Sequence, residues 1–442
     1  MALNALNLAD RGQRIGLRLI TRAGSLPLLH NPEVRRTVEH LLYRGSKGAF
    51  VALDRATRRS FPARSGSGAA KRTTAAAPRR EFDLTPSEDQ DMIRSAAAGL
   101  ADDVIRPAAA QADADRSVPE EVRRAAADLG LPLIGVPTDL GGIAEERSAV
   151  TTVLVLEELA RGDLGIATAL MAPAAVATAL ANYGSSAQQA TYLPAFTGDG
   201  LPAGASLALM EEGPLFDPLS PSTTATSRGG DLVLNGRKTL VVGAAEADLL
   251  VVSALVDGEP RLVLVEAGTR GVSVADDPAM GIRAARTGRI DLDDVVVPAT
   301  HLLGTTDDHL DAVRRARLAW AAAACGTAQA AVDQLVPYVT TRHAFGEPIA
   351  RRQAVAFGVA DVAIELAGLR LVVWRAAARL DQGKDASRLI ANARQLTARH
   401  GAQIGSQAVQ FLGGHGFVKE FDNERWYRDL RGAGVLEGVL LV

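Results

Sequence analysis

The sequence contains a single cysteine, Cys325, in 442 residues, so no disulfide can form within the chain. Its alanine-rich surroundings predict a buried, inert thiol, and we expect a reducing, cytoplasmic location. No Cys or His residues are paired at the spacing of metal ligands. A glycine-rich dinucleotide loop, a Walker loop and a Gly-x-Ser-x-Gly elbow are also missing. Chemistry that needs a metal or a serine or cysteine nucleophile therefore has no candidate residues.

Aromatic residues are scarce, at 4% of the chain, although apolar residues make up 47%. The core must therefore be built mainly from Ala, Leu and Val, which favours closely packed helices. No run reaches the roughly 18 apolar residues that a membrane span requires. Residues 1–20 carry three arginines and lack the apolar segment of a secretory signal. The composition predicts a soluble protein with a substantial core.

Charge is distributed unevenly along the chain. The net charge is −3, yet residues 1–80 hold 16 Lys and Arg against 4 Asp and Glu. Residues 1–62 show helical apolar spacing, and residues 63–80 have the composition of a flexible linker. We predict a basic arm that packs on the protein's own assembly or on a partner subunit, with binding to an anionic membrane surface as the alternative. We expect no nucleic-acid partner.

The order of predicted elements is helices, then strands, then helices. Helical periodicity covers residues 81–203, short alternating strands fill residues 204–300, and long helices return over residues 301–442. The sequence Asp-Gly-Glu-Pro at 257–260 predicts a hairpin turn between two strands. Because strands do not alternate with helices, a doubly wound nucleotide fold is disfavoured.

Two breaks in the C-terminal helices are candidates for a ligand site, at residues 342–353 and 410–417. Their glycines let a backbone approach a bulky ligand and expose amide groups to it. The arginine that opens the first break offers a planar fork suited to phosphate. Ordinary helix capping is the alternative role for these glycines.

Together with other short motifs, these breaks resemble the acyl-CoA dehydrogenase family over about residues 82–438. The resemblance implies a mainly α fold with a helical N-terminal domain, a central β-barrel and a C-terminal four-helix bundle, assembled as homo- or hetero-oligomers (dimers or tetramers). The motifs that carry it, in the family's order, include Gly130-Leu-Pro-Leu-Ile-Gly-Val-Pro137, Leu234-Asn-Gly236-Arg-Lys238, Met280-Gly281-Ile-Arg283, Arg342-x-x-Phe345-Gly346, Gln410-x-x-Gly413-Gly414, Arg428-Asp429 and Glu437-Gly438.

The resemblance implies FAD-dependent α,β-dehydrogenation of an acyl-CoA thioester, with electrons passed to an electron-transfer acceptor. A flavin accepts the hydride because no side chain can. Glu437 matches the catalytic base, and Arg317 matches a position that faces CoA. A base in an apolar pocket suits this chemistry, and the sequence around Glu437 is apolar and glycine-rich. In the family, one subunit binds the ADP half of the FAD of a neighbouring subunit. The positions of this sequence that match those binding residues are Arg342, Phe345, Gln353, Gln410, Gly413 and Gly414.

The sequence departs from the family pattern where the flavin ring would lie, and the Thr-x-x-Ile-Gln run that follows Glu437-Gly438 in the family is absent. These losses favour an alternative function, a flavin-poor partner subunit that completes FAD sites on a second chain. A third possibility, a non-enzymatic protein that binds anionic surfaces through its basic arm, leaves the ordered motifs unexplained. The replaced positions are Met210 and Phe216 for a threonine and a serine, Leu240 and Val242 for a tryptophan and a hydroxyl residue, and Arg314 for an acid.

Overall fold

The computed structural model of the chain describes residues 84–442, apart from residues 146, 199 and 215. Contacts between Cα atoms divide the chain into two units, Met1–Glu81 and Phe82–Val442. The predicted arm at residues 1–62 and the linker at residues 63–80 lie outside the described residues, so everything below concerns the second unit.

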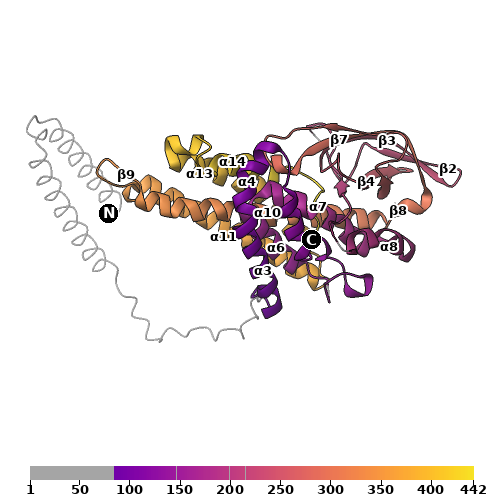
Figure 1. Cartoon of the computed structure of the whole chain (residues 1–442), viewed down its shortest axis with the longest axis horizontal. Helices are drawn as coiled ribbons and strands as arrows, with labels where there is room; N and C mark the ends of the chain where they lie inside the picture. The colour runs from indigo at the N-terminus through magenta and orange to yellow at the C-terminus, as the bar shows by residue number, and fades with distance from the viewer. Residues whose placement is uncertain (1–83, 146, 199, 215) are drawn as a thin grey trace, which may run out of the picture. The chain divides into compact units, whose positions relative to one another are not determined.

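The second unit begins with helices (Figure 1). Ser87 starts the first of them through a capping box with Gln90, and Asp163 starts α7 by accepting from the backbone N–H of Ile166. Among the described helices, only α7 is long and apolar enough to cross a membrane, and 89% of its apolar window is buried inside the protein. It is therefore placed as a core helix. The helices are α3 (Glu88–Leu100), α4 (Arg106–Asp115), α5 (Glu120–Asp128), α6 (Ala149–Gly162), α7 (Leu164–Tyr183), α8 (Ser186–Tyr192) and α9 (Pro194–Thr197).

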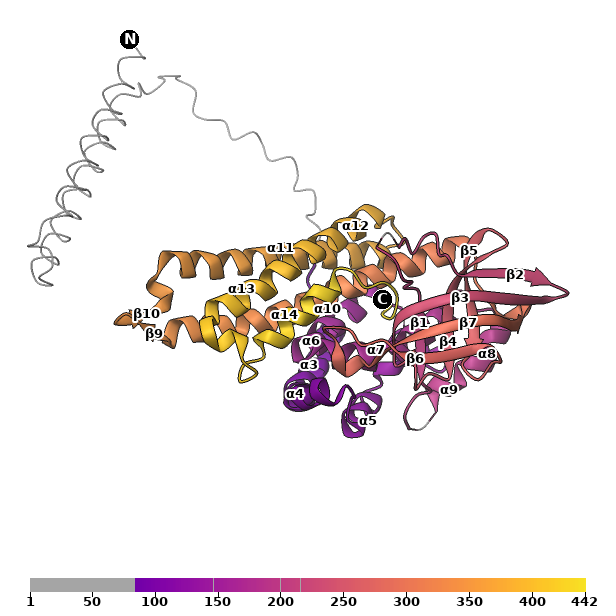
Figure 2. The same ribbon diagram turned by 90° about the horizontal axis from the view of Figure 1, so that it is seen from above.

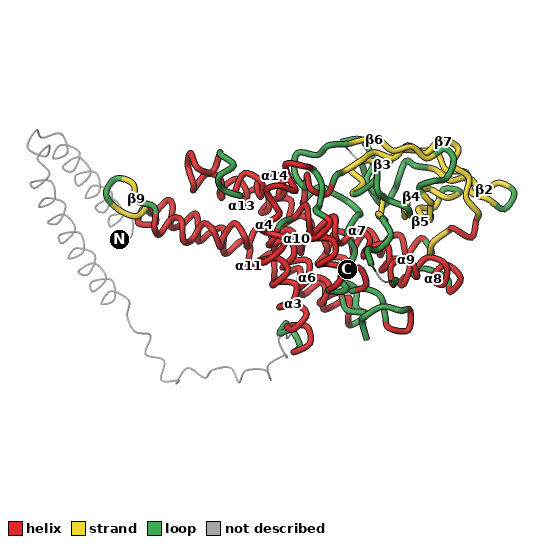
Figure 3. The backbone as a smooth tube through the Cα atoms, in the orientation of Figure 1, coloured by secondary structure: helices red, strands yellow, loops and turns green. Residues whose placement is uncertain are grey.

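A mixed sheet follows, and Figure 3 shows its strands gathered on one side of the second unit, with α8 and α9 beside them. Its strand order is β6-β7-β3-β2-β4-β5-β8, with β1 paired to β4. β1 and β2 run parallel to β4, and the other pairs are antiparallel. The predicted hairpin is confirmed, because Asp257 and Gly258, both at positive φ, turn β4 into β5. The strands are β1 (Ala205–Ala208), β2 (Thr224–Arg228), β3 (Asp231–Val242), β4 (Leu249–Val256), β5 (Glu259–Glu266), β6 (Val272–Asp276), β7 (Thr287–Pro298) and β8 (Leu302–Leu303).

The sheet is open, so the predicted β-barrel is wrong. Within the described part of the chain its end strands, β6 and β8, do not pair with each other, and β8 has only two residues. A barrel needs a ladder that closes with matched tilt and stagger. Alternating apolar residues indicate only that one face of each strand is buried. Here that face is buried in a cluster of its own, which includes Leu234, Val252 and Ile290.

The last part of the chain forms four helical rods, which confirms the predicted helical C-terminal region. A π-helical turn, Thr397–Gly401, joins α12 and α13 into one rod. Figures 1 and 2 both place the β9–β10 hairpin at the end of the rods farthest from the sheet. The elements are α10 (Thr306–Thr341), β9 (His343–Ala344), β10 (Glu347–Pro348), α11 (Gln353–Asp381), α12 (Ser387–Leu396), α13 (Ala402–Leu412) and α14 (Asn423–Ala433).

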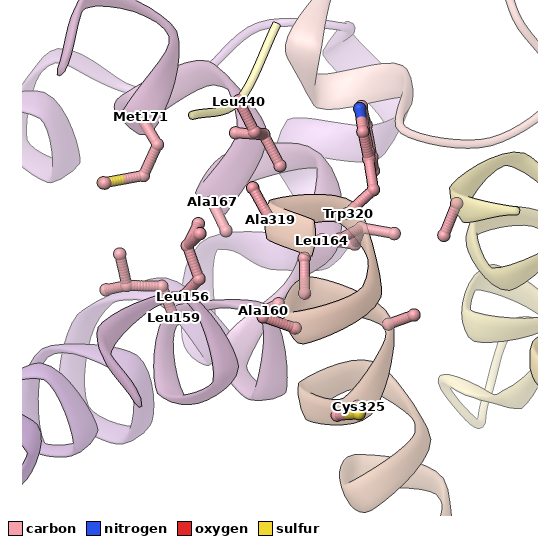
Figure 4. Close-up of a cluster of buried hydrophobic side chains, with 14 of the residues drawn as sticks. Leu156, Leu159, Ala160, Leu164, Ala167, Met171, Ala319, Trp320, Cys325 and Leu440 are labelled. Carbon is pink, nitrogen blue, oxygen red and sulfur yellow. The ribbon is translucent and has the colours of Figure 1, made fainter. Parts of the chain in front are cut away.

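Helices α6 and α10 pack at backbone distance and join the two helical regions in one core (Figure 4). Residues 319–325 of α10, mostly alanines, are each no more than 1% exposed. A Cβ atom at Gly326 would lie 1.9 Å from the carbonyl oxygen of Glu157 in α6. Cys325 is buried, as predicted, and burial raises the pKa of its thiol well above the usual range. Small side chains thus permit the close approach of the two helices.

Gly326→Ala is expected to destabilise the protein by about 2–3 kcal/mol, because the added methyl group overlaps the backbone of α6. Gly99→Ala is the matched control, since a Cβ there meets nothing within 4 Å. The control should gain roughly 0.5–1 kcal/mol through higher helix propensity. Urea unfolding measures both changes in free energy, and effects of equal sign would contradict the close helix contact.

Candidate active site

A cavity of about 610 Å³ opens near the end of α10, at the part of the rods farthest from the sheet. Its walls come from the end of α10, the start of α11, the end of α13 and the segment that follows α13. Four of the six residues predicted to hold a nucleotide line this one cavity. They are Arg342, Gln410, Gly413 and Gly414.

The two glycines of this cavity present bare backbone to open space. Gly413 ends α13 at a φ of +59°, a conformation that favours glycine. A Cβ atom at Gly413 or Gly414 would meet nothing within 4 Å, so internal packing does not require glycine at either position. Tyr338 braces the loop by donating to the carbonyl oxygen of Leu412 at 3.2 Å. The loop therefore has room for a ligand directly against its main chain.

Phe345 and Gln353, the other two predicted nucleotide-binding residues, lie outside the cavity walls. Phe345 sits in the turn between β9 and β10 and is 94% exposed. The guanidinium carbon of Arg352 lies 5.7 Å from its ring centroid, in a cation–π contact. Gln353 is exposed at the first position of α11. Within this chain, neither residue lines the cavity, so neither adds support for a ligand bound there.

The two segments predicted to face a flavin ring lie side by side in the sheet region. Thr239 donates from its backbone to the carbonyl oxygen of Met210 at 3.0 Å. Next to them, the Nζ atom of Lys238 donates to Glu211 at 2.6 Å and to Ser253 at 2.9 Å. Burial lowers the pKa of Lys238 to about 8, although the Glu211 carboxylate opposes the shift. Sequence reasoning missed this ion pair, which ties the two segments together.

Glu437 is buried, with 6% of its side chain exposed, and two arginines hold it. The Nε atom of Arg317 lies 3.0 Å from both carboxylate oxygens, and its Nη2 atom lies 2.9 Å from Oε1. The Nη2 atom of Arg394 lies 3.0 Å from the same Oε1. The structure brings the predicted base and the predicted CoA-facing arginine into direct contact. The predicted apolar pocket around Glu437 is wrong, because the cations come from distant helices.

Arg394 of α12 was not predicted as a site residue. It also donates to the carbonyl oxygen of Ala433, the last residue of α14, at 3.3 Å. Burial lowers the pKa of its guanidinium, and the nearby charge of Arg317 acts in the same direction. The only sequence signal is an arginine in an amphipathic helix, which is usually a solvated residue.

The residues after Glu437 turn inward and pack on β1. The backbone of Val439 donates to the carbonyl oxygen of Leu207 at 3.0 Å, and the indole of Trp320 donates to that of Gly438 at 2.9 Å. Val439 adopts a φ of +66°, which is strained for a β-branched residue. Residues 439–442 are each no more than 4% exposed, and Figure 4 shows Leu440 reaching into the core beside α7 and α10. This tail, residues 438–442, therefore fills space beside the segment predicted to face the flavin.

Three family descriptions match successive parts of the chain. They are the N-terminal domain of acyl-CoA dehydrogenases at residues 87–199, the middle domain at residues 206–295 and the C-terminal domain at residues 309–440. Together they cover the helical, sheet and helical regions in the order in which the structure has them.

Individual relatives span most of the chain. The NADH acryloyl-CoA reductase of Anaerotignum propionicum is 32% identical over 372 residues, which cover 81% of this chain and 93% of the relative. The mitochondrial short-chain specific acyl-CoA dehydrogenase of Rattus norvegicus is 32% identical over 364 residues, or 79% and 87%. Butyryl-CoA dehydrogenase from Megasphaera elsdenii superposes with a TM-score of 0.73 at 25% identity, over 80% and 95%. PigA, solved with FAD and proline, superposes with a TM-score of 0.74 at 26% identity, over the same shares.

The buried histidine beside Lys238 generates a prediction on pH dependence. Burial lowers the pKa of His309 to about 4, and the charge of Lys238 acts in the same direction, whereas an unfolded histidine titrates near 6.5. The stability that this group contributes is therefore full above pH 6.5 and is lost as the pH falls toward 4, up to roughly 3 kcal/mol. His309→Gln should lose less free energy of unfolding than wild type between pH 7 and pH 4.5. His343→Gln, at an exposed position, is the control, and identical pH profiles for all three proteins in urea unfolding would refute the prediction.

Proposed function

The chain belongs to the acyl-CoA dehydrogenase family of oxidoreductases, which act on the CH–CH bond of acyl-CoA and use FAD, and we propose that it catalyses the α,β-dehydrogenation of an acyl-CoA thioester. One observation carries the proposal. The positions that match the family's catalytic base and its CoA-facing arginine, Glu437 and Arg317, are 120 residues apart in sequence and meet at one buried site.

In this proposal Glu437 removes the proton from the α-carbon of the thioester. A carboxylate held within a buried site is a positioned base, and orientation of this kind is worth a large part of a barrier. Arg317, which is 25% exposed, is the cation available to the anionic CoA moiety. FAD, when bound, supplies the acceptor for the hydride that leaves the β-carbon. The product is the α,β-unsaturated thioester.

The cavity at the end of α10 fits the ADP half of FAD. Arg342 offers a fork for a diphosphate, and the open backbone of Gly413 and Gly414 admits a ligand at close range. The residues expected around the flavin ring fit FAD less well, because Met210, Leu240 and Val242 offer no side-chain hydrogen-bond donor. The two halves of the cofactor thus have unequal support in this chain.

The length of α10 supports an assembly of at least two chains. Arg342 follows Arg317 by 25 positions along this helix, which places them about 37 Å apart at 1.5 Å per residue. A dinucleotide whose diphosphate lies on Arg342 cannot place its flavin beside Glu437 of the same chain. Large apolar side chains on α11 and in the turns at the ends of the rods are exposed, as is typical of an interface, namely Phe345, Phe357, Ile364, Leu371 and Phe417. We include in the proposal an oligomer whose chains share FAD, a separate electron-transfer acceptor and a cytoplasmic location.

Glu437→Gln should lower acyl-CoA turnover, measured with an artificial electron acceptor, by on the order of 10² or more, while bound flavin stays near the wild-type level. The amide keeps the shape of the side chain but cannot take the proton. Glu420→Gln is the matched control, since Glu420 is exposed in the segment between α13 and α14, and it should leave turnover unchanged. Undiminished turnover in Glu437→Gln would remove this residue from the mechanism.

A second candidate function is a flavin-poor partner subunit of a heteromeric acyl-CoA dehydrogenase, and the tail favours it. Residues 438–442 are buried against β1 and the core, and Gly438 lies against Leu209, directly before the altered flavin-facing position Met210. The same chain keeps the arginine and glycines of the ADP cavity. Such a chain would contribute its cavity to the FAD of a neighbour that keeps the family's threonine and serine at the positions of Met210 and Phe216.

Flavin stoichiometry separates the two candidates. The partner-subunit function predicts a colourless chain when purified alone, and bound FAD when it is co-expressed with a subunit that has the complete segment. Arg342→Ala in this chain should then release that FAD and weaken the complex, whereas Arg351→Ala, at an exposed position nearby, should not. One FAD per chain in the protein purified alone would instead favour the catalytic subunit.

A further inference from the structure

The two arginines on Glu437 differ in how they are held, and this difference suggests different tasks. We propose that Arg394 is a positioning residue that keeps Glu437 in place throughout the reaction, and that Arg317 is an exchangeable partner that leaves Glu437 for the CoA moiety when substrate binds. The inference rests on the proposed function, in which Glu437 is the base.

The two carboxylate oxygens of Glu437 differ in the number of arginines that contact them. Oε1 receives contacts from both Arg394 and Arg317, at 3.0 Å from each. Among the described residues, Oε2 accepts only from the Nε atom of Arg317. Departure of Arg317 would therefore uncover Oε2 completely while Arg394 still holds Oε1. One oxygen becomes free for a proton without release of the side chain.

The contacts of Arg394 favour a side chain that stays in place. Its side chain is 16% exposed, and it bridges two points, the carbonyl oxygen of Ala433 and the carboxylate of Glu437. These points bracket the short link by which the chain leaves α14 and reaches the base. A planar guanidinium with two occupied nitrogens fixes the direction of that link, which a single point charge does not.

Arg317 is held by fewer groups than Arg394 and is more accessible to a ligand. It is more exposed, at 25%, and in the part of the chain that the structure describes its hydrogen bonds all go to Glu437. The two guanidiniums share one carboxylate oxygen, so they repel each other, and the repulsion contributes to the lowered pKa of Arg394. An arriving anion such as a CoA phosphate offers Arg317 a partner that relieves this repulsion.

The exchange links substrate binding to the availability of the base. While Arg317 is in place, both carboxylate oxygens of Glu437 accept hydrogen bonds, and departure of Arg317 leaves Oε2 free to take a proton. When Arg317 turns to CoA, the α C–H bond breaks, its proton goes to Oε2 of Glu437, and its electron pair remains on the thioester. Because the coupling is reciprocal, an ionised Glu437 in turn competes with CoA for Arg317.

The test follows α-proton exchange of saturated acyl-CoA thioesters of graded length in D₂O by mass spectrometry, with the FAD-loaded assembly. Arg394→Gln should lower the saturating exchange rate by about 10–100-fold and change acyl-CoA affinity little. Arg394→Lys should restore only part of the rate, because an ammonium group lacks the planar fork. Arg317→Gln should instead weaken acyl-CoA binding by about tenfold or more and keep a saturating rate near wild type.

Arg388→Gln is the matched control, since this arginine is exposed on the same helix. A purely structural role for Arg394 would lower the melting temperature while leaving the saturating exchange rate per folded chain unchanged, and that result overturns the proposal. So does equal weakening of acyl-CoA binding by both arginine substitutions. If wild type shows no exchange, or if Glu437→Gln exchanges at the wild-type rate, the proposed function itself fails. If Glu437→Gln abolishes exchange and Arg394→Gln leaves its rate unchanged, only the positioning role of Arg394 is refuted.

Discussion

Backbone contact between α6 and α10 is the constraint on which the rest of the structure depends. Gly326 brings α10 against the carbonyl oxygen of Glu157, and the buried carboxylate of the same glutamate binds Arg370 and Trp374 of α11. Burial raises the pKa of Glu157, and Arg370 opposes the shift. One residue of the first helical region thus fixes two rods of the last one. The connection between β6 and β7 is attached to this frame where Asp429 of α14 accepts from the backbone of Ile282 at 2.6 Å.

Because the frame fixes α10, it also fixes the separation of the two candidate sites. The base site lies in the first half of this helix and the nucleotide cavity at its end. No local rearrangement can bring the two together, since the rise per residue of an α-helix is fixed. In the proposed oligomer, the division of labour between chains is therefore a property of helix length rather than of loop conformation.

Local motifs could be predicted from the sequence because their residues are close in the chain. The loop with Gly413 and Gly414 follows its own helix, so a glycine pattern sufficed to place it. Sheet closure could not be predicted, because alternation reports one buried face and nothing about edges. The surroundings of Glu437 were also beyond reach. Its sequence neighbours are apolar, while its cations, Arg317 and Arg394, arrive from α10 and α12 through tertiary packing.

The scarcity of aromatics gives the protein three built-in optical reporters. The chain has only three tryptophans, Trp320, Trp374 and Trp426, and all lie on rods of the C-terminal region. The indole of Trp320 touches the tail carbonyl, and that of Trp374 touches the carboxylate of Glu157. Trp426 is 1% exposed in α14. Tryptophan emission from the whole chain therefore arises from one region, and a change in the Trp320 component reports displacement of the tail without any added label.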